Sequence, residues 1–458
     1  MIKMDLWILT EERPKKNVIS QIVTKLCNDK KIKFVEKDIL FKPIFDGKNF
    51  SFVYVVEGIT INKINKILIK IVSGGSSFVD FLIYFLNHQP TPRDIPIYAI
   101  EETKTSDSES RNTGVFQRCS KFVYITLHYP NCKKIMLYNI RVNDNGKPTK
   151  TNIFGTRMLI TLGVEIMGKN LDPKLFHKFE SIDEFIKFKN DMRAPPAGNV
   201  PINLKKFNDK ITVSGRLYKS GGLSHDPNIG ALSIISETLR FLGWKKDIVI
   251  TLHGLSQSNL GRTNKFIRIA NELDIKLDGL VLPKTILPDD YWHYDINSEK
   301  NGTIFLHLIL MEVENISIIY ENHAGCERGY FFDKDNTPIV IHKYIENNKS
   351  NGIIHIPDLI ICNHKTNEIY NYEGKTYANR INGVNEIENF DAIETEYLKR
   401  YYPNYKIIRG VVLYGSDSEV LDNDKIIFLL NKDGKIILNN NTPDIIKETI
   451  QKHLKSNN

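Results

Sequence analysis

The chain has 458 residues, of which 41% are hydrophobic and 25% are charged, and its formal net charge is +8. This length exceeds one ordinary hydrophobic core and predicts two or three domains, while the composition is typical of a globular protein. The mildly basic charge is compatible with a nucleic acid partner but does not require one, because only a local patch of cations would decide the matter.

The five cysteines are scattered and form no Cys-x-x-Cys pair. That pattern argues against a zinc ribbon or finger and predicts reduced thiols in a cytoplasmic protein. The N-terminal residues Met-Ile-Lys-Met-Asp-Leu-Trp contain no long apolar core and no cleavage site, so no signal peptide is expected. No apolar run reaches the length of a membrane span, and we expect no membrane partner.

The first part of the chain alternates apolar runs with polar turns, which predicts a mixed α/β domain. A proline-rich linker, Ala194-Pro-Pro-Ala-Gly-Asn-Val-Pro201, follows it. We expect an N-terminal nuclease-like domain with a helical extension at 1–195. Strands are expected at 52–56, 67–72, 78–85, 97–101, 122–127 and 134–140, and helices at 18–27, 114–121 and within 172–192.

The central region, 202–332, is expected to form further α/β structure that helps to recognise DNA. Its clearest helix covers 226–242, with Asp226 as N-cap, Pro227 in the first turn and Gly243 just past the end. A C-terminal nuclease-like domain is expected at 333–458. Strands are expected at 248–252, 303–312, 316–321 and 406–414 and on both sides of the turn within 353–375, and helices at 264–273, 339–347 and 385–401.

The segment 353–375 holds the most informative pattern. Asp358 begins one apolar strand, and Glu373 and Lys375 lie on the next, with one residue between them. Residues two apart on a strand face the same side, so adjacent strands would bring two carboxylates and an ammonium together. Magnesium prefers hard oxygen ligands and keeps several waters, so one or two carboxylates suffice to bind it. The pattern therefore predicts a Mg²⁺ site suited to phosphodiester hydrolysis.

A second copy of this pattern lies upstream. Asp80 precedes an apolar run, and the next predicted strand ends in Glu102-Thr103-Lys104. Glu101 and Glu102 are neighbours on a strand and face opposite ways, so only one of them can join Asp80. The spacing to Lys104 favours Glu102. The plain alternative for both copies is a strand edge whose charges oppose aggregation.

The pattern Pro357-Asp358…Glu373-Gly374-Lys375, with its flanking helices and strand, resembles the PD-(D/E)xK nuclease superfamily over roughly 339–414. Asp80…Glu102-Thr103-Lys104 resembles a second member, with Val79 where the family usually has proline. The resemblance implies a restriction-endonuclease-like α/β core of mixed sheets flanked by helices, in two copies. In each copy the aspartate and glutamate would bind Mg²⁺, and the lysine would orient or deprotonate the attacking water.

In restriction enzymes of this fold, polar residues after the catalytic strand often reach the DNA. By that resemblance the DNA-binding candidates here are Ser110, Arg111, Asn112, Gln117, Arg118 and Lys121. The plain alternative is the solvated start of a helix.

The resemblance implies a type II, site-specific endonuclease for double-stranded DNA that leaves a 5′-phosphate and a 3′-hydroxyl. A chain with two sites could act as a monomer, whereas one site would require a homodimer. A cognate DNA methyltransferase encoded nearby would be its expected companion. Two other functions stay open: a non-catalytic DNA-binding protein with this fold, and a nuclease for RNA or branched DNA in repair or defence.

Overall fold

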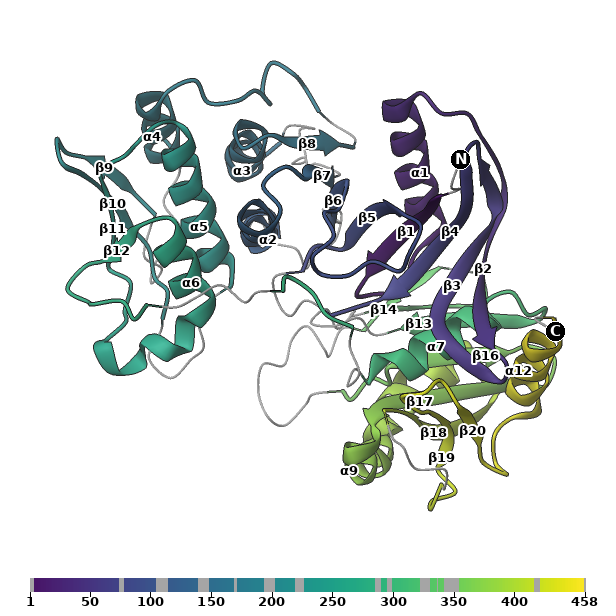
Figure 1. The fold of residues 1–458 in the computed structure, drawn as a ribbon. Coiled ribbons are helices and arrows are strands. Elements are labelled where there is room, and N and C mark those ends of the chain that lie inside the picture. The colour runs from purple at the N-terminus through teal and green to yellow at the C-terminus, as the bar shows by residue number, and fades with distance from the viewer. Residues whose placement is uncertain are drawn as a thin grey trace. The chain divides into compact units, whose positions relative to one another are not determined.

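The protein is described by a computed structural model, whose contacts divide it into two compact units (Figure 1). Unit 1 comprises 1–73, 86–89 and 294–458, and unit 2 comprises 74–85 and 90–293. The residues that the structure describes are 4–73, 78–103, 114–138, 148–168, 171–192, 202–218, 226–284, 290–294, 299–321, 330–335, 337–341, 354–415 and 421–456.

Unit 1 contains a curved run of strands in the order β2-β3-β4-β1. Strands β2, β3 and β4 pair antiparallel, and β4 pairs parallel with β1. Helix α1 lies beside this run (Figure 1) and buries the apolar face that includes Val18, Ile22 and Leu26. The elements are β1 (Met4–Thr10), α1 (Lys16–Lys30), β2 (Phe34–Asp46), β3 (Asn49–Ile61) and β4 (Ile64–Ile71).

The second sheet of unit 1 has the order β13-β16-β17-β18-β19-β20. Strand β16 pairs antiparallel with β17, whereas β17, β18 and β19 run parallel. Helix α7, which is buried along most of its length, packs against β17, β18 and β19 and also against β2. The elements are α7 (Lys300–Leu310), β13 (Ile316–Glu321), β16 (Leu359–Asn363), β17 (Glu368–Thr376), β18 (Lys406–Tyr414), β19 (Ile426–Leu430), β20 (Ile436–Leu438) and α12 (Asp444–Ser456).

A chain of short helical turns connects β17 to β18, and the partly buried Arg409 on β18 forms ion pairs with these turns. The Arg409 guanidinium on β18 donates to both carboxylate oxygens of Glu394, at 2.9 and 2.8 Å, and Asn371 on β17 donates to the same carboxylate. The turns are η3 (Tyr377–Asn379), α9 (Arg380–Glu386), η4 (Ile387–Phe390), α10 (Asp391–Ile393), the π-helical η5 (Glu394–Leu398) and α11 (Lys399–Tyr401). A two-stranded sheet of β14 (Tyr330–Phe332) and β15 (Pro338–Val340) completes the described part of unit 1.

Unit 2 is built from two groups of strands with helices between them. One group has the order β5-β6-β7-β8 and the other β12-β11-β10-β9. A shared apolar core contains side chains of α2, α3, α5, α6 and the second group of strands. The elements are β5 (Phe81–Leu86), β6 (Tyr98–Thr103), α2 (Gly114–His128), β7 (Lys133–Tyr138), α3 (Lys150–Thr161), β8 (Val164–Met167), α4 (Ile182–Asn190), β9 (Leu204–Lys206), β10 (Lys210–Ser214), α5 (Asp226–Phe241), β11 (Asp247–Thr251), η2 (Gln257–Thr263), α6 (Asn264–Glu272) and β12 (Ile275–Leu277).

The mixed α/β class expected from the sequence is confirmed, since mixed sheets flanked by helices make up both units. The expected end of the central helix is also confirmed, because Gly243 adopts a φ of 93° directly after α5. Within the described ranges, every helix is too short or too polar to cross a bilayer.

Two expected strands are wrong. The segment 303–312 falls largely in α7, and 122–127 falls in α2. Both are short, continuous apolar runs, which look the same whether they are buried as strand or as helix. The expected helix at 339–347 begins on β15, and its residues from 342 onward lie outside the described part.

The compact units also cut across the three expected segments: the boundary at 195–202 falls inside unit 2, and that at 332–333 falls inside unit 1.

Replacing Arg409 by methionine tests the anchor of the helical turns. Glu394 is only 6% exposed, and without its partner it would keep a buried, uncompensated charge. We expect the Arg409→Met change to lower the free energy of unfolding by about 3–5 kcal/mol, measured by urea denaturation followed by circular dichroism. The control, Lys42→Met, breaks an exposed pair with Glu57 in the same unit and should cost about 1 kcal/mol or less. Equal effects of the two changes would refute the anchoring role.

Candidate functional site

The C-terminal pattern converges at one end of the β16–β17 pair in unit 1. Leu359 pairs with Tyr372 in the antiparallel register, which brings Asp358 opposite Glu373. The backbone N–H of Gly374 donates to Asp358 Oδ2 at 2.9 Å. Because this bond joins the aspartate side chain to the strand that carries the glutamate, the two carboxylates are held next to each other.

Gly374 is required at this point by close packing. A Cβ on this residue would lie 3.0 Å from Thr303 Cγ2 of α7 and 3.2 Å from Asp358 Oδ2. The first turn of α7 therefore packs directly on the strand between Glu373 and Lys375. A side chain at position 374 would displace either the helix or the aspartate.

Lys375 is held between two carboxylates. Its Nζ lies 2.7 Å from Glu373 Oε1 and 2.8 Å from Glu386 Oε2 on α9. Burial alone would lower the pKa of Lys375, but the hydrogen bonds to Glu373 and Glu386 outweigh burial and raise the pKa above its ordinary value. The side chain is therefore an ammonium. An ammonium cannot accept a proton, so the raised pKa does not support the expectation that Lys375 deprotonates water. That Lys375 donates hydrogen bonds and supplies positive charge stays a prediction.

The pKa of Glu373 is raised as well, but for a carboxyl group this shift favours the neutral form. Burial, followed by the negative charge of Asp358, raises the pKa of Glu373 to about 8, although Lys375 opposes the shift. Two carboxylates that repel each other in a partly buried site form a donor set that a divalent cation would stabilise. Asp358 and Glu373 thus fit a hard cation such as Mg²⁺.

Among the described residues, no group of three or more His, Cys, Asp or Glu side chains is placed to hold a metal ion. Magnesium usually keeps several waters and needs only one or two carboxylates, so the pair of Asp358 and Glu373 meets its requirement.

Two further acids of this cluster were missed by sequence reasoning. Glu299 lies at the start of α7; burial raises its pKa, and the charges of Lys375 and Asp358 act on it in opposite directions. Glu386 on α9 has a lowered pKa, because its interactions with Lys375 outweigh the effect of burial. No local signal marks Glu299, since an apolar run follows it. Glu386 lies at the start of an expected helix, but nothing in that pattern aims it at the site.

The upstream pattern forms a similar cluster in unit 2, in which Glu101 holds the position of Glu373. Phe81 pairs with Ile100, which brings Asp80 opposite Glu101. The Glu102 N–H donates to Asp80 Oδ2 at 2.6 Å, as Gly374 does to Asp358. By this register Glu101 holds the position that Glu373 holds in unit 1, whereas the spacing to Lys104 had favoured Glu102.

The cation of the upstream cluster comes from a helix. Lys121 on α2 donates to both oxygens of Glu101, at 2.9 and 3.0 Å, and its Nζ lies 3.7 Å from Asp80 Oδ1. Glu101 is fully buried and its carboxylate also accepts from the Asp80 N–H. Lys121, which was expected among the DNA-binding residues, lies in this carboxylate cluster.

The other upstream candidates cannot be placed in the cluster. Lys104, Ser110, Arg111 and Asn112 lie outside the described residues. Gln117 and Arg118 lie on the backbone of α2, and the described part of the structure does not include their side chains.

The titration of Glu373 can be measured in the protein kept free of metal. The folded state retains a proton on Glu373 between about pH 4.5 and pH 8, where the unfolded chain has released it. The contribution of this group to the free energy of unfolding is therefore present at low pH and is lost as the pH rises to 8. In EDTA, thermal unfolding of the wild type should lose stability relative to Glu373→Gln across this window. A constant difference between the two proteins would show that the Glu373 pKa is not raised.

Comparisons with known proteins add no assignment to this geometry. No family model, no curated protein and no solved structure matches the chain. Function must therefore be argued from the two carboxylate clusters themselves, and the resemblance to the PD-(D/E)xK superfamily remains an expectation drawn from the spacing of residues in the sequence.

Proposed function

We propose that the protein is a Mg²⁺-dependent endonuclease that hydrolyses phosphodiester bonds of double-stranded DNA. The observation that carries the proposal is the cluster of Asp358, Glu373 and Lys375, in which two adjacent carboxylates lie beside a lysine held as an ammonium. A site-specific enzyme of the type II restriction class, with a PD-(D/E)xK core and acting in the cytoplasm, is the form of this activity that the residue pattern favours.

The roles of the residues follow from their charge states. Asp358 and Glu373 would hold the magnesium ion, which when bound acidifies water and neutralises charge on the phosphate. Lys375 stays protonated and donates to a non-bridging phosphate oxygen or to the attacking water, so that it stabilises charge developing in the transition state. Glu386 also binds the Lys375 ammonium and thereby positions it. The proton of the attacking water goes to a group other than Lys375, because an ammonium cannot accept it.

The cluster in unit 2 supports a second cleavage centre in the same chain. Asp80 and Glu101 reproduce the strand register of Asp358 and Glu373, and Lys121 supplies the ammonium. A duplex break needs one hydrolytic event on each strand. Two centres in one chain would allow a monomer to cut both strands, and a homodimer would then be unnecessary.

The substrate and partner follow from charge and from the class of enzyme. The net charge of +8 favours binding to the phosphate backbone, and affinity carried by Lys and Arg should decrease steeply with salt. A DNA methyltransferase encoded nearby, which protects the host sequence, would be the companion of such an enzyme.

Removing either the aspartate or the lysine tests the activity. We expect the wild type to linearise plasmid DNA with Mg²⁺ and not with EDTA, and Asp358→Asn and Lys375→Met to linearise it at least about 100-fold more slowly. The matched controls, Asp433→Asn in an exposed turn and Lys406→Met at the exposed start of β18, should linearise it like the wild type. Linearisation that survives both site changes, or any cleavage that proceeds in EDTA, would contradict the proposal.

Nicking of supercoiled plasmid tests the second centre. If both centres act, Lys375→Met and Lys121→Met should each yield mainly nicked circles, with opposite strand preference on a defined duplex. Glu101 is buried, so loss of Lys121 alone leaves an unpaired charge, and the double variant Glu101→Gln/Lys121→Met removes both charges. Lys178→Met, an exposed change in unit 2, is the control. Full double-strand cleavage by the double variant would show that the unit 2 cluster does not hydrolyse DNA.

A further inference from the structure

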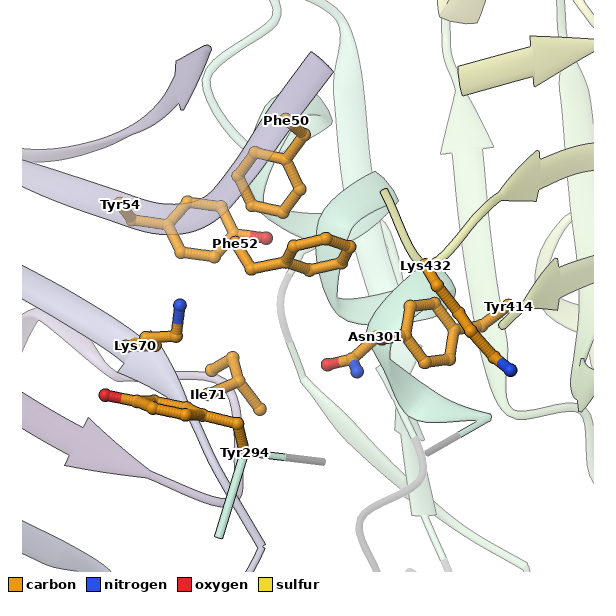
Figure 2. Close-up of a pocket in the computed structure, with 9 residues that line it drawn as sticks. All are labelled: Phe50, Phe52, Tyr54, Lys70, Ile71, Tyr294, Asn301, Tyr414 and Lys432. Carbon is orange, nitrogen blue, oxygen red and sulfur yellow. The ribbon is translucent and has the colours of Figure 1, made fainter. Parts of the chain in front are cut away.

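Unit 1 contains a pocket that takes no part in the proposed hydrolysis. It is lined by five aromatic side chains, two lysines, one asparagine and one isoleucine, and it encloses about 500 Å³ including the open solvent at its mouth (Figure 2). The lining side chains come from β3, β4 and α7, from the end of β18, from the turn between β19 and β20, and from Tyr294. This combination of rings and cations differs from an ordinary apolar gap.

The aromatic rings form walls of the pocket. The rings of Phe52 and Tyr414 meet edge to face, with centroids 5.9 Å apart and planes at 81°. Phe50 backs Phe52 at a centroid distance of 5.1 Å and is itself buried. Tyr294 forms a separate wall beside Lys70 and Ile71 (Figure 2). Walls of this kind suit a flat aromatic ring, because stacking on such faces adds to the burial of area.

Two ammonium groups flank these rings without a carboxylate partner among the described residues. Lys70 Nζ lies 4.6 Å from the centroid of the Tyr294 ring and 3.2 Å from the amide oxygen of Gln89. Burial lowers the pKa of Lys70 to about 8, so its charge is poorly solvated. Lys432 is exposed and also lines the pocket (Figure 2). An anion at the pocket would stabilise the charged form of Lys70 and would meet a second cation at the rim.

The pocket is held in place by the packing around it. Phe50 donates its N–H to the Gly434 carbonyl at 2.8 Å, and a Cβ on Gly434 would lie 1.9 Å from the Phe50 carbonyl oxygen. Phe52 adopts a φ of 57°, a strained conformation for a bulky residue. The strand that carries both phenylalanines is therefore fixed against the β19–β20 turn, so the rings need little reorganisation to receive a ligand.

We propose that this pocket binds a nucleotide, with the base stacked on the aromatic walls, its edge read by the Asn301 carboxamide, and the phosphate held by Lys70 and Lys432. The Asn301 side chain points toward the middle of the pocket (Figure 2), and a carboxamide contains both a donor and an acceptor group. An apolar ligand would leave both ammonium groups unused, and inorganic phosphate would leave the rings unused. A nucleotide uses both kinds of group.

The pocket adjoins the carboxylate cluster through two elements. The first turn of α7 carries Glu299 and Thr303 toward the cluster and Asn301 toward the pocket. Tyr414 pairs with Thr376, the residue after Lys375. The same base-and-phosphate chemistry could come from a free nucleotide or from an unpaired base of a strand bound at the cluster. The inference is independent of hydrolysis, because it concerns binding alone.

Calorimetric titration of the full chain in EDTA tests the proposal without any contribution from metal or cleavage. The probes are the four deoxynucleoside 5′-monophosphates, the matching nucleosides, inorganic phosphate and a short single-stranded oligodeoxynucleotide. We expect at least one monophosphate to bind more tightly than its nucleoside and than phosphate. Tighter binding of the oligonucleotide than of any monophosphate would identify the source as a strand, and the reverse would identify a free nucleotide.

Variants then locate the binding. Lys70→Met and Tyr294→Leu should each weaken monophosphate binding by about tenfold or more, whereas Lys42→Met, an exposed lysine of the same unit, should leave it unchanged. Thermal unfolding of each variant verifies that the fold is retained. No binding of any monophosphate or of the oligonucleotide, or wild-type affinity in both pocket variants, would overturn the proposal. Equal affinity for phosphate alone would also overturn it, because the rings would then have no role.

Discussion

One hydrogen bond organises each candidate centre: a backbone N–H, from the residue after a strand glutamate, donates to the side chain of an aspartate on the neighbouring strand. The bond occurs between Gly374 and Asp358 in unit 1 and between Glu102 and Asp80 in unit 2. It holds two carboxyl groups next to each other, an arrangement that electrostatics opposes when both are ionised. The rest of each cluster offsets this repulsion, through Lys375 in one case and Lys121 in the other.

Helix α7 connects this constraint to the remainder of unit 1. Its first turn packs on Gly374, and Gly302 permits close approach to β18, where a Cβ would lie 2.8 Å from Val412 Cγ1. The same turn supplies Glu299 to the carboxylates and Asn301 to the aromatic pocket. A single buried helix thus sets the positions of groups that belong to two different sites. The ion pair between Arg409 and Glu394 fixes the helical turns that follow α9, the helix that carries Glu386.

Much of this arrangement could be predicted from periodicity and spacing. The strand over Lys406–Tyr414 and the helix ending before Gly243 are marked by local signals, and the convergence of Asp358 with Glu373 follows from two short strands joined by a turn. Long-range packing could not be predicted. Continuous apolar runs such as Ile304–Leu310 do not reveal whether they form helix or strand, and a wrong choice there hides the placement of Glu299. The pocket escapes sequence reasoning for the same reason, because its lining residues come from six separate places in the chain.

The position of Lys121 on a helix affects how such clusters can be recognised from a sequence. Its ammonium reaches Glu101 from a helix some twenty positions further along the chain. The cluster is therefore defined by the positions of its side chains in space and not by a fixed spacing in the sequence. A sequence pattern with fixed gaps would not find Lys121 as a member of this group. A search of structures could first look for the hydrogen bond from a backbone N–H to an aspartate side chain, and then for any cation nearby. Such a search would find both clusters, whether the lysine lies on a strand or on a helix.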